Sequence, residues 1–146
     1  MSKRNIGLYR YLIAITLGLG CVLIAASTSA NDDSQFIPVT LKYVIDGDTF
    51  RGFVNGDIDD VPIRLRDVDT PERRGKCQQE KDMALEATDY LKKLLKTGVI
   101  ELSNVGEDKY GRVLADVYVD KQSVSKLIIE NGYGRQWSGR RESWCN

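Results

Sequence analysis

The sequence predicts an α+β, mainly β fold, a small closed β-barrel of about five strands with two or so helices packed against it. Alternating apolar and polar residues, typical of half-buried strands, fill most of residues 36–66 and return over residues 99–120. Apolar residues at helical spacing occur within residues 83–95 and 124–131. Strands this few and this closely linked do not suit a doubly wound parallel sheet, so a covered barrel is the economical arrangement.

The amino-terminal half of the predicted barrel is an antiparallel meander. In "FIPVTLKYVIDGDTFRGFV", residues 36–54, the odd positions from 39 to 45 are apolar, with polar Thr40 and Lys42 between them. A hairpin-type turn, "NGD" at 55–57, precedes a further alternating stretch, "VPIRLR" at 61–66. We expect residues 31–35 to be a frayed start.

The carboxyl-terminal half begins with a helix and returns to strands. The helical spacing runs to Leu95, and Gly98 is placed to end this helix. Two strands, "VIELSNV" and "RVLADVYVD", then flank the loop "GEDKYG". Ser123 is placed to cap a short helix, "VSKLIIEN", and Gly132 to stop it.

Residues 1–30 have the pattern of a secretory signal. Basic residues lead into the apolar run of residues 11–26, and small residues precede Ala30, after which we expect cleavage. That run is shorter than the roughly 20 residues that span a bilayer, although a retained anchor is the alternative. The remaining residues, 31–146, suit one domain, which we expect to be a secreted or periplasmic monomer without stable membrane association.

Charge and composition narrow the functional classes. Loss of the three basic residues of the signal from a total of 21 leaves 18 against 21 acidic residues, a net charge of −3. This balance argues against a generic nucleic-acid coat. The sequence has no histidine, which excludes Ser-His-Asp and Cys-His hydrolases and imidazole-bound zinc sites. If the chain is an enzyme, its catalytic groups must be carboxylates, arginines, lysines, tyrosines or an oxygen-liganded metal.

Cys77 and Cys145 form the single possible disulfide pair after signal removal. In an oxidising compartment their bond would stabilise the fold by roughly 2–4 kcal/mol. Two free thiols are the alternative.

Three polar stretches fall in turns or at strand ends, where barrel side chains converge on one rim. They are "DGDT" at 46–49, "RLRDVDTPE" at 64–72 and "DKYGR" at 108–112. Taken alone, the first and the third are typical of ordinary turns. In the second, Pro71 keeps Thr70 out of helical geometry, so the strand ends there with a free carbonyl.

Arg64 and Asp69 have opposite parity along the strand. If they serve one site, alternation must break between them, which predicts an irregularity near residues 66–68. Two carboxylates and a carbonyl held together suit a hard cation such as Ca²⁺. Arginines beside them suit a phosphate, and a spare carboxylate suits a water, which together favour phosphodiester cleavage.

The order "VIDGDTF", "IRLRDVDTPE", helix, "DKYGRVLADVYVD", short helix and "NGYG" resembles the staphylococcal nuclease (thermonuclease) family across most of residues 39–134. The resemblance implies an OB-type five-stranded barrel and Ca²⁺-dependent hydrolysis of DNA and RNA to 3′-phosphate ends. It implies these roles: Asp48, Asp69 and Thr70 as Ca²⁺ ligands, Arg64 and Arg112 as the phosphate-gripping pair, Glu72 as the group that positions or activates water, and Lys109 and Tyr110 as contacts to a terminal phosphate.

The carboxyl-terminal tail does not align confidently with the family. Its aromatic residues, Tyr133, Trp137 and Trp144, would stack on a base, although for the two tryptophans we prefer packing at the end of the barrel. Its arginines, Arg135, Arg140 and Arg141, would guide the phosphate backbone or form a solvated basic rim. A second functional reading is an OB-type module that binds nucleic acid or a protein without cleavage.

Overall fold

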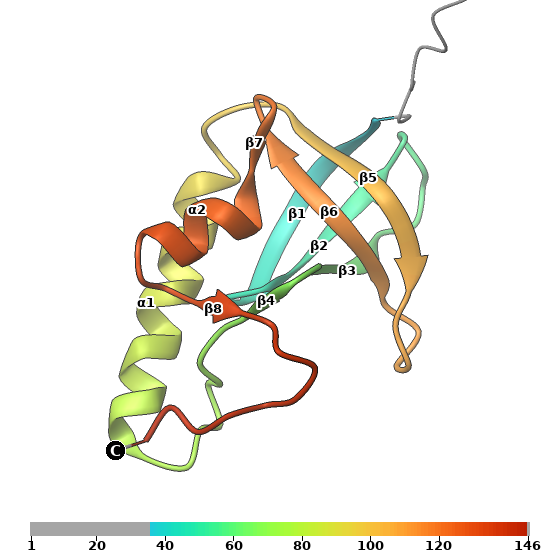
Figure 1. Ribbon diagram of the computed structural model, residues 1–146. Coiled ribbons are helices and arrows are strands. Elements are labelled where there is room, and N and C mark those ends of the chain that lie inside the picture. The colour runs from blue at the N-terminus through green and yellow to red at the C-terminus, as the bar shows by residue number, and fades with distance from the viewer. Residues whose placement is uncertain (1–35, 146) are drawn as a thin grey trace, which may run out of the picture. The chain divides into compact units, whose positions relative to one another are not determined.

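The computed structural model describes residues 36–145 (Figure 1). The predictions made for residues 1–30 and 31–35 lie outside the described residues. In chain order the elements are β1 (Ile37–Asp46), β2 (Thr49–Val54), β3 (Val61–Leu65), β4 (Val68–Asp69), α1 (Gln78–Leu94), β5 (Ile100–Glu107), β6 (Val113–Val119), β7 (Gln122–Ser123), α2 (Val124–Glu130) and β8 (Arg135–Gln136).

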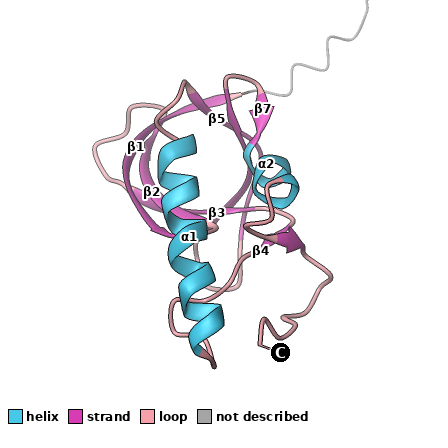
Figure 2. Ribbon diagram, turned by 90° about the vertical axis from the view of Figure 1, so that its left-hand side faces the viewer, coloured by secondary structure: helices cyan, strands magenta, loops and turns pink. Residues whose placement is uncertain are grey.

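Strands β1, β2, β3, β5 and β6 form a closed barrel, which confirms the predicted fold. The meander β1–β2–β3 is antiparallel, as are the pairs β1–β5 and β5–β6. The barrel closes through a parallel pair, β3–β6, in which Arg64 is the register partner of Leu114. Parallel neighbours need a long crossover, and α1 and β5 supply it. Figure 2 shows the barrel from another side, with α1 and α2 next to it.

The core lies inside the barrel and under the two helices. Alternation turns one side chain in two inward, so fully buried residues of the barrel, among them Phe50, Ile63 and Leu65, share the interior. Helix α1 adds Leu91 and α2 adds Ile128 to the same cluster. Neither of these helices, within the part of the chain that is described, is long and apolar enough to cross a membrane.

The helix ends agree with the sequence in one case and differ in the other. Ser123 caps α2, since its hydroxyl accepts a hydrogen bond from the Lys126 amide, and Gly132 follows the helix with φ +78°. Helix α1 ends at Leu94, before Gly98, so the stop predicted at Gly98 was wrong. Gly98 instead gives room to Asp120, whose carboxylate would lie 2.0 Å from an added Cβ.

The predicted break near residues 66–68 is confirmed. Strand β3 ends at Leu65, and Asp67 turns the chain with φ +60°. Strand β4 then leaves the barrel sheet and pairs with β8. This turn breaks the strict strand alternation between Arg64 and Asp69.

Candidate active site

Arg64 joins the first two polar stretches. Its Nη1 lies 2.5 Å from Oδ1 of Asp48, and its Nη2 donates to the Val68 carbonyl at 3.3 Å. Asp48 is buried, and Thr49 Oγ1 also donates to its Oδ1 at 2.9 Å. The guanidinium therefore lies between the turn after β1 and strand β4, and it compensates a buried negative charge.

Gly47 allows the turn after β1 to approach the end of β4. A Cβ added at Gly47 would lie 2.8 Å from Thr70 Oγ1 and 2.8 Å from the Ala87 Cβ. Any larger residue would push the two segments apart, so glycine is needed for this close approach. The turn thus brings Asp48 next to the segment of Asp69 and Thr70, all three of which are buried.

Asp46 adds a third carboxylate to this group. Burial and then the charge of Asp48 raise the pKa of Asp46 to about 6 from its usual 3.8. Crowded carboxylates of this kind lose their mutual repulsion when a cation is bound, so the acidic group suits a positive ion.

We expect Asp46→Asn to change how stability depends on pH in the chelated protein. The folded state keeps the Asp46 proton to about pH 6, whereas the unfolded chain releases it near 3.8, so stability falls as pH rises through this window. The free energy of unfolding should fall by about 2–3 kcal/mol across this window in the unchanged protein. The Asp46→Asn protein should not show this fall. Urea unfolding at pH 4 and pH 8 in EDTA measures this difference, with exposed Asp59→Asn as the control. Equal effects of Asp46→Asn at both pH values would contradict it.

One carboxylate oxygen of Asp69 accepts hydrogen bonds, and the other accepts none from the described residues. Its Oδ2 accepts hydrogen bonds from Arg135, from Nε at 3.1 Å and from Nη2 at 2.9 Å. Its Oδ1 is buried and accepts no hydrogen bond from residues 36–145. Arg141 Nη2 lies 3.3 Å from this oxygen, an ion-pair contact without hydrogen-bond geometry. A buried carboxylate oxygen without a donor fits a cation ligand, and oxygen donors alone favour a hard ion.

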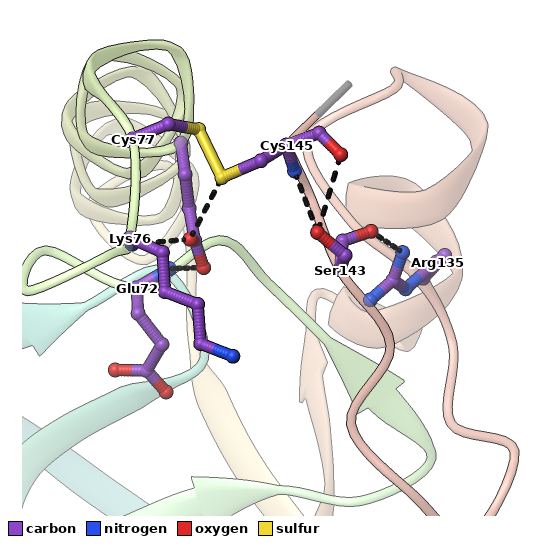
Figure 3. Close-up of a disulfide and its surroundings, with 7 residues drawn as sticks. Glu72, Lys76, Cys77, Arg135, Ser143 and Cys145 are labelled. Carbon is purple, nitrogen blue, oxygen red and sulfur yellow. Dashed lines mark hydrogen bonds between the residues drawn. A yellow bond between two sulfur atoms is a disulfide. The ribbon is translucent and has the colours of Figure 1, made fainter.

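Glu72 lies in the turn that follows Pro71. Its carboxylate is 44% exposed and contacts Arg141 Nη1. Buried Glu80 holds the backbone of this turn, accepting from the Lys76 amide at 2.9 Å and from the Glu72 amide at 3.4 Å. The Glu72 side chain in Figure 3 is directed away from the helix. It is therefore available to a ligand once Arg141 moves.

Arg112 directly precedes β6, the strand that pairs with the strand of Arg64, but its side chain binds elsewhere. Leu114 is the register partner of Arg64, and Arg112 precedes Leu114 by two residues, in the loop just before β6 begins. The Arg112 guanidinium binds Asp108 of its own loop, with Nε at 2.8 Å and Nη2 at 2.7 Å. No contact within the described chain joins it to the buried carboxylates, so only Arg64 of the predicted pair touches them.

Lys109 and Tyr110 occupy the tip of the same loop. The Tyr110 side chain is 71% exposed, and the Lys109 ammonium lies 5.0 Å from its ring centroid. The loop and the tail both lie below the barrel in Figure 1. The predicted contact of these two residues with a terminal phosphate stays a prediction.

The tail is packed onto the site. Tyr133 stacks on Tyr90 with ring centroids 4.3 Å apart, and the Trp144 ring lies 3.9 Å from the Arg135 guanidinium. Tyr133 packs against the core, whereas Trp144 lies on Arg135 and not at the end of the barrel, and Trp137 is 37% exposed. The Cys77–Cys145 disulfide is present and is shown in Figure 3.

The tail arginines do not behave alike. Arg140 is solvated, with 82% of its side chain exposed. Arg135 and Arg141 contact Asp69, which neither the phosphate reading nor the solvated-rim reading anticipated. No local pattern marks this contact, because it depends on a two-residue strand pair between β4 and β8.

Comparisons with known proteins agree with this geometry. A family model described as "Staphylococcal nuclease homologue" matches residues 62–143. Two Bacillus subtilis (strain 168) proteins are similar to the chain. The SPbeta prophage-derived endonuclease YokF is 36% identical over 104 residues, which cover 69% of this chain and 34% of that protein. Endonuclease YncB is 35% identical over 114 residues, 76% of this chain and 53% of that protein.

A Haemophilus influenzae protein named as an uncharacterized endonuclease is 29% identical over 89 residues, which cover 61% of this chain and 46% of that protein. The two Bacillus relatives are longer proteins, and the chain spans from about a third to about half of their length.

Proposed function

Because the chain belongs to the staphylococcal nuclease homologue family, we propose that it is a nuclease, a metal-dependent phosphodiester hydrolase that acts on DNA and RNA. We propose Ca²⁺ as the metal, 3′-phosphate ends as the products and a secreted or periplasmic monomer as the working form. The buried Oδ1 of Asp69, which accepts no hydrogen bond from the described residues, is the observation that carries this proposal.

The cation would be held by Asp48, Asp69 and the Thr70 carbonyl. All three supply oxygen atoms. Asp48 follows Gly47 in the turn that lies in close contact with Thr70, and Asp69 is the residue before Thr70. When bound, the ion would supply positive charge to the phosphate and make a water more acidic. A disulfide and an amino-terminal signal pattern both support export.

The remaining residues divide the chemistry among them. Arg64 and Arg112 would bind phosphate oxygens and stabilise the charge that develops as the phosphorus becomes five-coordinate. Arg112 would first have to leave Asp108. Glu72 would orient the attacking water or accept its proton. Water attacks phosphorus, the bond to the 5′ oxygen breaks, and a 3′-phosphate and a 5′ hydroxyl result.

We expect the protein to cut single-stranded DNA in the presence of Ca²⁺ and to stop when a chelator is added. A labelled oligonucleotide separated on a denaturing gel measures the cleavage. Treatment of the fragments with phosphatase should make their 3′ ends extendable by a polymerase, because a 3′-phosphate blocks extension.

Two results would contradict the proposal. Binding without cleavage, with and without Ca²⁺, would favour the non-cleaving OB-type module. Cleavage that survives chelation would remove the metal from the mechanism. RNA of the same sequence provides the comparison of substrates.

A further inference from the structure

We propose that Arg135 is a positioning residue, which holds the Asp69 carboxylate so that its free oxygen faces the cation, and that the Cys77–Cys145 disulfide keeps Arg135 in place. This inference rests on the proposed function, since it concerns the same cation site.

Arg135 is engaged on every side of its guanidinium. Nε and Nη2 donate to Oδ2 of Asp69, Nη2 donates also to the Glu142 carbonyl at 2.7 Å, and Nη1 donates to the Ser143 carbonyl at 3.2 Å. The Trp144 ring covers the flat face of the group. With its donors used in this way, Arg135 suits the fixing of a carboxylate better than the grip of a phosphate.

The backbone also places Arg135 beside Asp69. The two residues are register partners in the β4–β8 pair. Gly134 permits the close approach, because a Cβ there would lie 3.0 Å from the Asp69 carbonyl oxygen. The side chain of Arg135 therefore starts next to its target and needs only to be kept from turning away.

The two hydrogen bonds to Oδ2 determine what Oδ1 can do. A carboxylate that accepts two bonds on one oxygen is fixed in rotation, and its other oxygen points in a fixed direction. Here that other oxygen is buried and accepts no hydrogen bond from the described residues. Groups that hold a metal-binding side chain in this manner raise the affinity for the metal.

The disulfide holds the partners of Arg135. The tail after β8 has no helix or strand within residues 137–145, and its carbonyls at 142 and 143 are two of the groups that Arg135 contacts. Cys145 follows these residues at once and is bonded to Cys77, the residue before α1 (Figure 3). The bond thus fastens the tail to the start of a helix, five residues after Glu72.

Arg141 differs from Arg135 in the oxygen that it approaches. It lies near Oδ1 of Asp69 and contacts Glu72, so it occupies the side on which the cation would be bound and has to move. Arg135 uses the opposite oxygen and is compatible with a bound ion. Loss of Arg135 should therefore weaken cation binding, although it removes a positive charge from the site.

The experiment measures Ca²⁺ binding to the full protein by isothermal titration calorimetry, without nucleic acid. We expect Arg135→Gln to weaken binding by about 10- to 100-fold, which is typical of the loss of a group that holds a metal ligand. Arg135→Lys should be almost as weak, because one ammonium keeps the charge but cannot reproduce the planar two-bond contact. Arg140→Gln, on the same tail but solvated, should bind as the unchanged protein does.

A double-mutant cycle tests the link to the disulfide. Cys77→Ser with Cys145→Ser should weaken Ca²⁺ binding in the otherwise unchanged protein but have little further effect in the Arg135→Gln protein. Circular dichroism confirms that each variant is folded at the temperature of the titration. Equal losses in both backgrounds would overturn the role of the disulfide.

Two outcomes separate this inference from the proposed function. If the unchanged protein binds Ca²⁺ and Arg135→Gln binds it equally or more tightly, the positioning role is wrong while the nuclease proposal stands. If the unchanged protein binds no Ca²⁺, both the calcium site and the positioning role fall.

Discussion

Arg64→Ala is expected to lower kcat by about 100- to 1000-fold, the loss typical of removing one group that stabilises transition-state charge. Of the predicted phosphate-gripping pair, only Arg64 contacts the buried acidic residues of the site within the described chain, through Asp48. Its guanidinium spans from Asp48 to the carbonyl of Val68, the residue before Asp69, and so contacts both segments that would hold the cation. Initial rates of oligonucleotide cleavage at saturating Ca²⁺ measure the effect.

The same substitution removes the partner of a buried carboxylate, so a loss of stability has to be separated from a loss of chemistry. Asp48 is 4% exposed in its side chain, and without Arg64 its charge is uncompensated in the chelated protein. Bound Ca²⁺ would supply the missing charge. We therefore expect the variant to melt at a lower temperature in EDTA, to recover with Ca²⁺, and to remain folded but slow.

Arg51→Ala is the matched control. Arg51 lies on β2, on the face that Arg64 shares, and forms an ion pair with Asp60 away from the acidic group. The Arg51→Ala protein should be somewhat less stable than the unchanged protein and should cleave the oligonucleotide at the same rate. A folded Arg64→Ala protein with an unchanged rate, or wholesale unfolding of that variant with Ca²⁺ present, would assign Arg64 to the structure and not to the chemistry.

The sequence predicted the part of the site that depends on local chain geometry. Opposite strand parity meant that the chain must break its alternation if Arg64 and Asp69 were to serve one site, and the turn at Asp67 supplies this break. Likewise, Pro71 predicted the end of the strand at Thr70. These features depend on neighbours within a few residues, where backbone preferences are strong.

The sequence did not predict the features that depend on distant segments. The parallel β3–β6 pair, which closes the barrel, has no local signal, because periodicity reports which face is buried and not which strand lies beside it. The contact of Arg135 with Asp69 joins residues 66 positions apart through a strand pair of two residues. The position of Gly98 was misread for the same reason, since its small size serves Asp120 and not the helix end.

Glu72→Gln is expected to reduce kcat by about 100- to 10,000-fold, the range that a positioned proton acceptor contributes. Glutamine keeps the size of the side chain and one acceptor oxygen, but it cannot accept a proton from water. Glu72 is 44% exposed, and its turn is held by backbone hydrogen bonds to Glu80, so the change should not alter the fold. Cleavage rates from pH 5 to pH 9 measure the effect.

The position of Glu72 explains why this loss should appear in kcat rather than in Ca²⁺ affinity. Its carboxylate contacts Arg141 rather than the groups that would hold the ion, and that contact must open before a water can take its place. Exposed Glu86→Gln on α1 provides the control and should cut at the unchanged rate. If Glu72→Gln instead weakened Ca²⁺ binding and left the rate at saturating Ca²⁺ intact, Glu72 would be a ligand of the ion, and the water would need another base.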